Sequence, residues 1–377
     1  MKKKVLLIEP YYAGSHKVLI DLLCSLFDSC SEGEDAPEVH LATMTGKKWH
    51  WRARTSALHF AQTIPIAQDF VYETIFASCV LPLHELLALR PDLVNGKKIL
   101  YFHENQLVYP RRKIKDRDFQ YGYNQIMSCL VADVVLFNSN FNKDSFLSSM
   151  KSFFKLQPDY RPKNLRESIE PKCRVLYFPI DFTKIENIMP REDPSWNEIR
   201  IVWPHRWEYD KNPEMFFNTM VRLVGEGITN FRLSVLGENF ADNPPIFDEA
   251  KTLLKDYIIH FGYLNSKDEY YQVLRQSDIV ISTADHEFFG VAMVEATFCG
   301  CFPLCPNSLV YPEIFSSCPG SLFKSADDLY LILKKVLADP ITFRKNSKTA
   351  SVIDFNKFDW ATLKLNFAQE LLLDDLG

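Results

Sequence analysis

This 377-residue sequence contains no apolar run that approaches the roughly 20 residues of a membrane-spanning helix. Its lysine-rich start resembles a signal peptide, but the apolar part, residues 5–8, is too short for one and predicts a buried strand instead. With 47% hydrophobic and 24% charged residues, the composition is that of a globular protein. We therefore expect no membrane partner and a chain long enough for two domains.

Metal-binding patterns are also missing from the sequence. The nine cysteines contain no CxxC pair of the kind that zinc sites use, and most of them lie in apolar stretches. The acidic pair Asp116 and Asp118 imitates a DxD metal motif, but it lies in a charged run where such triplets arise by chance. We expect no metal and no other cofactor. Free thiols predict a reducing compartment, the cytoplasm or also the nucleus.

Two common nucleotide-binding fingerprints do not occur either. A dinucleotide dehydrogenase would carry GxGxxG after its first strand, where this chain has one glycine, Gly14, and there is no GxxxxGK[ST] loop. Short apolar runs nevertheless alternate with helical patterns, which is typical of parallel α/β layers. The alternation stops at the polar, proline-containing stretch 187–198 and then begins again. It predicts two α/β halves with a ligand-binding cleft between them.

The two halves differ in charge. Residues 1–190 hold 25 basic and 21 acidic side chains, whereas residues 191–377 hold 18 and 27. The net charge of −5 for the whole chain therefore hides a positive first half, which favours a polyanionic partner on that side.

The segment 282–300 carries the strongest sign of a nucleotide site. A strand ends near Thr283, Glu287 follows in a loop, and Gly290 allows close approach of backbone to a ligand before a helix begins. The N–H groups at such a helix start bind pyrophosphate. Glu295 lies among apolar neighbours, where a carboxylate needs hydrogen bonds that ribose hydroxyls would supply. The alternative is that Glu287 is a solvated loop residue and Glu295 a surface helix residue.

The Glu287-x7-Glu295 spacing with an intervening Phe-Gly resembles the retaining glycosyltransferases of the GT-B fold, group four. Segment 201–217 resembles the part of that family in which an arginine and a lysine five residues later clamp the donor diphosphate, here Arg206 and Lys211. The resemblance covers almost the whole chain. It implies two Rossmann-like α/β domains facing across a cleft, an acceptor-binding domain at 1–185 and a nucleotide-sugar-binding domain at 186–355. A last helix within 356–377 crosses back to the first domain.

The resemblance also implies roles for individual residues. Arg206 and Lys211 stabilise the departing diphosphate, Glu287 binds sugar hydroxyls, and His103 orients the sugar or the acceptor. These four are the expected catalytic residues, although without the resemblance the position of His103 favours a core histidine. The expected donor-binding residues are Gly14, Arg206, Lys211, Glu287, Phe289, Gly290, Val291 and Glu295.

Three further stretches, 47–66, 99–110 and 117–135, narrow the resemblance to the tRNA-queuosine α-mannosyltransferase group. This implies transfer of mannose from GDP-mannose to queuosine at the wobble position of tRNA for aspartate. Two other classes stay open: a transferase with a small or lipid acceptor, and a non-catalytic RNA-binding module on the same fold.

Residues 46–60 combine tryptophan, histidine and basic side chains without an evident amphipathic period. Aromatic rings stack on unpaired bases and arginines contact phosphates, so this stretch suits a tRNA acceptor. The alternative is a structural loop with tryptophans packed into the domain and arginines capping helices. Residues 151–172 are expected to form an exposed basic insertion on the same half. The expected acceptor-binding residues are Trp49, Trp51, Arg52, Arg54, His103, Arg111 and Arg112.

Overall fold

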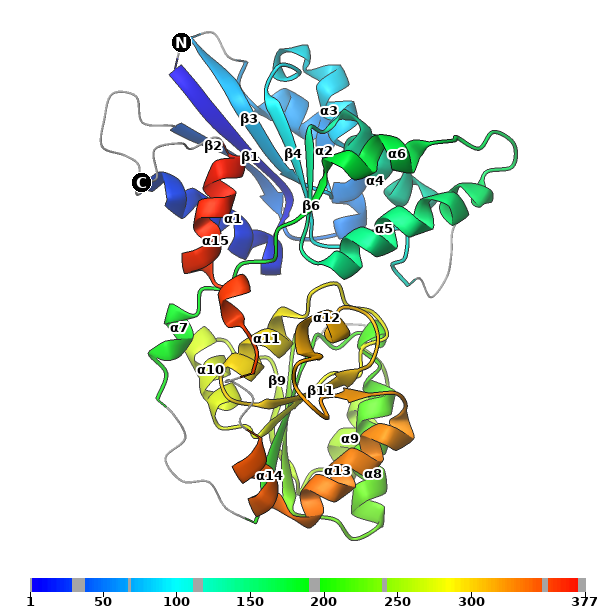
Figure 1. Ribbon diagram of the computed structural model, residues 1–377, viewed down its shortest axis with the longest axis vertical. Coiled ribbons are helices and arrows are strands. Elements are labelled where there is room, and N and C mark those ends of the chain that lie inside the picture. The colour runs from blue at the N-terminus through cyan, green and yellow to red at the C-terminus, as the bar shows by residue number, and fades with distance from the viewer. Residues whose placement is uncertain are drawn as a thin grey trace. The chain divides into compact units, whose positions relative to one another are not determined.

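The computed structural model describes residues 2–28, 38–66, 69–110, 118–189, 197–238, 243–347 and 352–371. The chain divides into two compact units (Figure 1). Unit 1 comprises Met1–Pro179 and Lys357–Gly377, and unit 2 comprises Ile180–Asn356. Each contains a six-stranded sheet, and all recorded strand pairs are parallel. In the described part of the chain, no helix has the length and apolar character needed to cross a membrane.

Unit 1 has the strand order β2-β1-β3-β4-β5-β6. Its strands are β1 (Lys2–Tyr12), β2 (Glu38–Thr45), β3 (Phe70–Ser78), β4 (Lys97–Phe102), β5 (Val134–Phe137) and β6 (Cys173–Val175). Its helices are α1 (Gly14–Asp28), α2 (Trp49–Thr63), α3 (Leu83–Leu89), α4 (Phe119–Val131), α5 (Asn140–Phe153), α6 (Leu165–Ile169) and α15 (Trp360–Glu370). Val5 to Ile8 are all buried, because helices cover both faces of a parallel sheet and its strands become continuous apolar runs.

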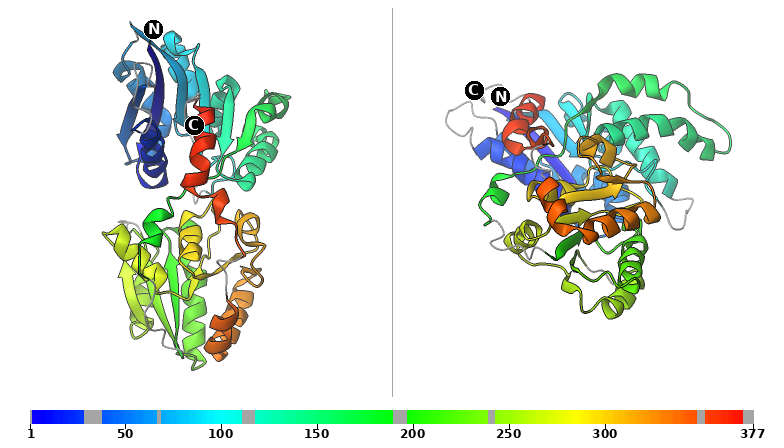
Figure 2. Two further views of the ribbon diagram at one scale, coloured as in Figure 1. Left: turned by 60° about the vertical axis from the view of Figure 1, so that its left-hand side comes forward. Right: turned by 60° about the horizontal axis from the view of Figure 1, so that its bottom comes forward.

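Unit 2 has the strand order β12-β11-β10-β7-β8-β9, with helices on both sides of the sheet (Figure 2). The strands are β7 (Ile199–Pro204), β8 (Phe231–Leu236), β9 (Ile258–Gly262), β10 (Ile279–Ile281), β11 (Phe302–Pro306) and β12 (Leu322–Phe323). The helices are α7 (Thr183–Glu186), α8 (Pro213–Gly225), α9 (Ile246–Leu253), α10 (Lys267–Arg275), α11 (Val291–Phe298), α12 (Tyr311–Phe315), α13 (Ala326–Ala338) and α14 (Pro340–Asn346). This order makes β7 and β10 neighbours, so the loops that follow them start side by side.

The last helix, α15, belongs to unit 1 (Figures 1 and 2). Lys97 at the start of β4 donates to the Glu370 carbonyl oxygen over 2.6 Å, and Arg174 in β6 pairs with the Glu370 carboxylate at 2.7 Å. The Phe367 ring lies 6.1 Å from the ring of Tyr101. The chain thus returns to the sheet from which it started.

The tryptophan-rich stretch is helical, and the expectation that it lacks an amphipathic period was wrong. Most of it lies in α2, whose inner face buries Ala53, Ser56, Ala57 and Phe60, at the spacing of one side of a helix. Three of these four residues are small, so the stripe is inconspicuous beside the large polar and aromatic side chains around it.

The expected exposed insertion at 151–172 is also only partly exposed. Phe153, Phe154 and Ile169 are buried in the core of unit 1, where both phenylalanine rings contact that of Phe119 in α4. Leu156 and Tyr160 between them are exposed. Two short helical turns flank this exposed part, so the segment is a packed connection with one solvated loop.

Gly237, directly after β8, is required by a close backbone contact. Its φ is 146°, and a Cβ atom built on it would lie 1.8 Å from the carbonyl oxygen of His205. His205 directly precedes Arg206 in the loop after β7. The glycine therefore allows the two strand ends to approach each other and fixes the loop that carries Arg206.

We predict that Gly237→Ala lowers the free energy of unfolding by about 1–3 kcal/mol, as expected when a side chain is forced into packed space. The control is Gly225→Ala at the end of α8, where an added Cβ has no neighbour within 4 Å. Urea denaturation of both variants measures the effect. Equal midpoints for the two variants would contradict the close contact at Gly237.

Candidate functional site

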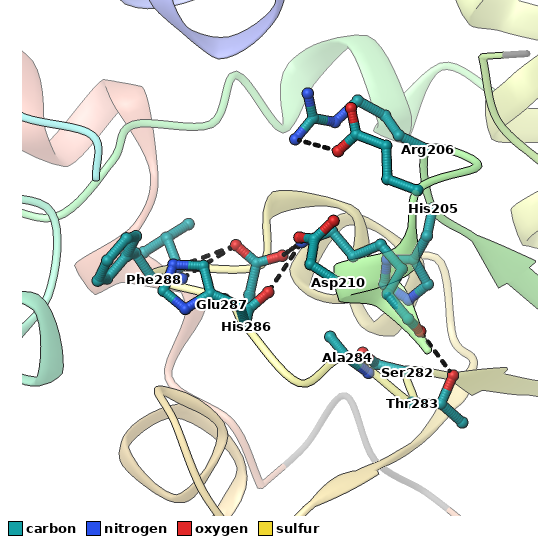
Figure 3. Close-up of polar contacts among 12 residues, drawn as sticks. His205, Arg206, Asp210, Ser282, Thr283, Ala284, His286, Glu287 and Phe288 are labelled. Atoms are coloured by element: carbon teal, nitrogen blue, oxygen red, sulfur yellow. Dashed lines mark hydrogen bonds and ion pairs between the residues drawn. The ribbon is translucent and has the colours of Figure 1, made fainter. Parts of the chain in front are cut away.

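The loops after β7 and β10 form one connected structure in unit 2 (Figure 3). Thr283 Oγ1 donates to the Lys211 carbonyl over 2.9 Å, and the Asp285 N–H donates to the Asp210 carbonyl over 2.9 Å. These contacts hold residues 210–211 against the loop that carries Glu287. Parallel strands bring such loops together at their carboxyl ends, where ligands bind in open α/β sheets.

Lys211 lies at the centre of this structure. Its Nζ donates to the His286 carbonyl over 2.9 Å, and it forms ion pairs with Asp210 at 3.1 Å and Glu287 at 3.3 Å. Its side chain is only 9% exposed. A lysine is rarely buried to this extent unless it is paired, and here three oxygen atoms surround the ammonium. Lys211 was expected to bind the donor diphosphate, but its contacts in the structure mainly hold the two loops together.

Glu287 is ionised at neutral pH. Burial alone would raise the pKa of its carboxyl, but the charge of Lys211, with those of His205 and His286, outweighs burial and lowers the pKa to about 2. Its Oε1 accepts from the Phe288 N–H over 3.1 Å. This excludes the interpretation of Glu287 as a solvated loop residue and leaves a carboxylate whose spare lone pairs can accept hydrogen bonds.

Arg206 differs from Lys211 in its exposure. Its side chain is 50% exposed and pairs with Glu208 at 3.2 Å. In Figure 3 the side chain of Arg206 lies apart from those of Asp210 and Glu287. The structure therefore brings Lys211 and Glu287 into contact and leaves the guanidinium of Arg206 accessible to an anion.

The start of α11 has the geometry expected for backbone N–H groups that bind an anion. Gly290 is the N-cap with a φ of 79°, a left-handed conformation that favours glycine. The first N–H groups of a helix have no partner within the helix. Phe289 is only 3% exposed, so its ring is not a surface for the donor, and its N–H donates to Glu287 Oε1 over 3.5 Å. Val291 begins the helix.

Glu295 is buried within α11, which excludes the interpretation of a surface residue. Its Oε1 accepts from Lys267 Nζ over 2.9 Å and from Tyr271 OH over 3.0 Å. The prediction that this carboxylate needs hydrogen bonds is correct, but α10 supplies two of them. Both use the same oxygen, and the hydroxyl of Tyr270 in the same helix is a further hydrogen-bond partner of this carboxylate.

In unit 1, Gly14 and His103 lie at the ends of strands. Gly14 starts α1 with a φ of 51°, and His103, directly after β4, is 93% buried with its ring stacked on that of His16 at 3.9 Å. Glu9, His16 and His103 have potential ligand atoms within 4.8 Å of one another, the one such group found in the described ranges. Each ring nitrogen of His16 already faces a carboxylate, that of Glu9 or of Glu104.

The expected acceptor residues on α2 differ in environment. Trp51 is 52% exposed, whereas Trp49 packs edge-on against Tyr121 with ring centroids 5.2 Å apart. The guanidinium of Arg54 lies over the ring of Trp51, 5.0 Å from its centroid. Arg52 donates to the carbonyl and hydroxyl oxygens of Thr45, so its main contacts are structural. Arg111 and Arg112 lie outside the described residues.

Several residues around the site were not predicted. Lys267 and Tyr271, the partners of Glu295, lie in the first turns of α10, and their sequence context resembles any polar helix start. His16 could have been found, because it occupies the buried stripe of α1 with Leu19, Ile20 and Leu23. A polar residue on such a stripe needs partners.

Residues 4–180 match the family model described as tRNA-queuosine alpha-mannosyltransferase N-terminal, and residues 184–351 match that of glycosyl transferases group 1. The Drosophila melanogaster protein named tRNA-queuosine alpha-mannosyltransferase is 47% identical over 350 residues, 91% of this chain and 89% of that protein. The Homo sapiens alpha-1,3/1,6-mannosyltransferase ALG2 is 23% identical over 194 residues, 47% of this chain and 43% of its own.

Solved structures confirm the GT-B fold. Anabaena HepE in complex with UDP aligns with a TM-score of 0.66 at 15% identity, over 98% of this chain and 100% of that chain. Sucrose-phosphate synthase from Thermosynechococcus elongatus aligns with a TM-score of 0.67 at 14% identity, over 97% of this chain and 98% of its own. At such identities the likeness concerns the fold alone.

The ion pair of Glu287 predicts a dependence of stability on pH. Because folding lowers the pKa of Glu287 from 4.5 to about 2, its contribution is complete above pH 4.5 and is lost as the pH falls to about 2. We expect Glu287→Gln to unfold more easily than the wild type at pH 7, with a difference that shrinks through this window. Urea midpoints from pH 2 to 7 test this, with Glu249→Gln on the exposed side of α9 as the control. A difference that is constant across the range would refute the assigned ion pair.

Proposed function

Because the chain belongs to the tRNA-queuosine α-mannosyltransferase family, we propose that it transfers mannose from GDP-mannose to queuosine at the wobble position of tRNA for aspartate, with retention of configuration. The observation that carries the proposal is the arrangement at the carboxyl ends of β7 and β10. There an accessible Arg206 and an ionised Glu287 accompany the helix start at Gly290.

The donor diphosphate requires positive charge where its negative charge grows as it leaves. In this proposal the guanidinium of Arg206 and the first N–H groups of α11 contact the diphosphate. Lys211 adds its charge from its buried position and holds Glu287 in place. Charges fixed before the reaction stabilise the transition state without reorganisation.

Two carboxylates make the remaining contacts with the sugar donor. Glu287 accepts hydrogen bonds from hydroxyls of the mannose, since it stays ionised at neutral pH. Glu295 accepts from the ribose through Oε2, while Lys267 and Tyr271 hold its other oxygen. His103, and the start of α1 at Gly14, orient the sugar or the acceptor. The donor needs no metal ion in this scheme, because side chains and backbone supply the charge stabilisation.

The tRNA acceptor is proposed to bind unit 1. Its exposed Trp51, with Arg54 over the ring, offers a stacking surface and a positive charge together. The basic side chains of 111–117 and the exposed part of 151–172 are further candidates for phosphate contacts. The cysteines of the described residues are free, which suits a reducing compartment, so we place the activity in the cytoplasm or also the nucleus.

The proposed function is tested by incubating the protein with GDP-mannose and queuosine-containing tRNA, then analysing the nucleosides by mass spectrometry. We expect a hexose on queuosine. The matched controls are the same tRNA without queuosine and UDP-glucose as the donor. Transfer from UDP-glucose alone, or transfer to tRNA that lacks queuosine, would contradict the proposal.

For the donor site we predict that Arg206→Ala lowers kcat by about 10²–10³, the effect of removing one donor that stabilises developing negative charge. Because Arg206 is half-exposed, stability should change little. Arg222→Ala, an exposed arginine on α8, is the control and should retain the wild-type rate. A near-normal rate for Arg206→Ala at saturating GDP-mannose would remove Arg206 from the site.

For the acceptor site we predict that Trp51→Ala weakens tRNA affinity about fivefold or more, since stacking on one base contributes roughly 1–3 kcal/mol. GDP-mannose affinity and melting temperature should not change. Trp49→Ala should mainly lower the melting temperature, because that ring packs on Tyr121. Leu331→Ala removes an exposed apolar side chain from α13 in unit 2 and is the control. Unchanged tRNA affinity in a folded Trp51→Ala protein would exclude a stacking role.

We further predict that mannose transfer persists in excess EDTA. The charges that the reaction requires are assigned to side chains and helix N–H groups, so chelation should leave the initial rate unchanged. The measurement compares initial rates with EDTA, without EDTA and after readdition of Mg²⁺ or Mn²⁺. A rate that is lost in chelator and restored by either ion would show that a metal takes part.

A further inference from the structure

A buried chain of charged groups lies beneath His103. Glu9 follows the apolar part of β1, His16 is in the first turn of α1, and Glu104 follows His103. His16 Nδ1 is 3.1 Å from Glu9 Oε2, and His16 Nε2 is 3.4 Å from Glu104 Oε2. A carboxylate accepts hydrogen bonds, so both ring nitrogens of His16 must donate. His16 is therefore an imidazolium held between two carboxylates.

Glu9 is fixed by further contacts. Its carboxylate is fully buried, and its Oε1 accepts from the Tyr11 N–H over 2.8 Å and from Ser78 Oγ over 3.0 Å. A carboxylate without water is stable only with such hydrogen bonds and an opposite charge. Glu9 therefore holds His16 at one defined place below the end of β4.

His103 is stacked on this imidazolium. The two rings are 3.9 Å apart with an interplanar angle of 28°, and Tyr101 meets His103 edge-on at 4.9 Å. His103 is 7% exposed, and its ring nitrogens have no hydrogen-bond partner among the described residues. A second positive charge so close to His16 is unfavourable, whereas a neutral ring over a cation is attracted to it.

The pKa values have the directions that this arrangement requires. Burial opposes the charge on His16, but Glu9 and Glu104 outweigh it and raise the pKa of His16 to about 10. Burial and the charge of His16 hold the pKa of His103 well below its usual value. Three further titratable groups lie nearby in the described part of the chain. Tyr101 meets His103, and burial raises the pKa of its hydroxyl; the Tyr11 ring is 5.8 Å from that of His16; Cys79 donates to the Glu104 carbonyl, and burial raises its pKa.

We propose that Glu9, His16 and Glu104 are positioning residues that hold His103 as a neutral imidazole, with one ring nitrogen ready to accept a hydrogen bond from a hydroxyl of the sugar or of the acceptor nucleoside. This inference rests on the proposed function. A histidine with an ordinary pKa near 6.5 would carry a proton in roughly a quarter of molecules at pH 7 and could not accept in that state. The burial of His103 and the positive charge of His16 below its ring keep His103 unprotonated, so that it can accept the hydrogen bond in every molecule.

The wild-type protein provides the first test, which needs no activity. In protein with ¹⁵N-labelled imidazoles, NMR from pH 5.5 to 8.5 should show His16 with both nitrogens protonated throughout and His103 neutral throughout. Single replacements assign the signals of the nine histidines. Titration of His16 near pH 6.5, or a protonated His103 at pH 7, overturns the proposal whether or not the transferase assay succeeds.

The second test replaces the charge but keeps a ring. His16→Phe leaves a stacking partner, removes the cation and leaves Glu9 and Glu104 near His103, so the pKa of His103 should rise. On the acid side of its pH profile, we expect kcat/KM for tRNA to fall about tenfold per pH unit. This fall should begin at a higher pH in the variant than in the wild type. KM for GDP-mannose should not change. The control is His40→Phe, because His40 lies on β2 and bonds to Tyr72.

A pH profile of His16→Phe that matches the wild type overturns the proposal. Metal analysis adds a second independent outcome. A stoichiometric divalent ion bound to ring nitrogens of both His16 and His103 would also overturn it, because a coordinated imidazole cannot carry two ring protons. If His16→Phe does not fold, the NMR titration of the wild type still tests the protonation states of His16 and His103.

Discussion

A buried ammonium group holds the candidate donor site together. Lys211 lies among the carboxylates of Asp210 and Glu287 and the carbonyl of His286, so one charge connects the loops after β7 and β10. A lysine removed from water requires such partners, since an unpaired buried charge costs several kcal/mol. The same contacts keep Glu287 ionised and fix the loop that leads to Gly290. The start of α11, the proposed diphosphate site, therefore depends on a side chain that is itself almost inaccessible.

Unit 1 uses the same physical principle with a different cation. The imidazolium of His16 lies between Glu9 and Glu104, as the ammonium of Lys211 lies between Asp210 and Glu287. In both units the cluster is at the carboxyl ends of parallel strands, where loops from distant parts of the chain converge. Charges that are fixed by folding do not have to reorient during a reaction. For a transfer that passes through a leaving diphosphate and an oxocarbenium-like sugar, such fixed charges are the main contribution that a protein can make.

The architecture could be predicted because its signals are local. Apolar runs such as residues 5–8 identify buried parallel strands, and amphipathic stretches between them identify the crossover helices. The prediction failed where the signal was weak or the contacts were distant. In α2 the inner face consists mainly of alanine and serine, so its period was overlooked. In 151–172, buried phenylalanines adjoin an exposed loop, and only their packing against α4 distinguishes the two.

The sequence by itself determined the candidate residues of the donor site: Arg206 and Lys211 after one strand, and Glu287 and Glu295 around a later helix start. Only the tertiary structure decided what each of them can do. Lys211 meets its partners 75 and 76 positions away, and Glu295 meets Lys267 and Tyr271 across 28 and 24 positions. Periodicity and spacing report local conformation, whereas burial and ion pairing arise only when distant segments pack together. Arg206 and Lys211 therefore look equivalent in the sequence, although folding leaves one exposed to solvent and surrounds the other with protein.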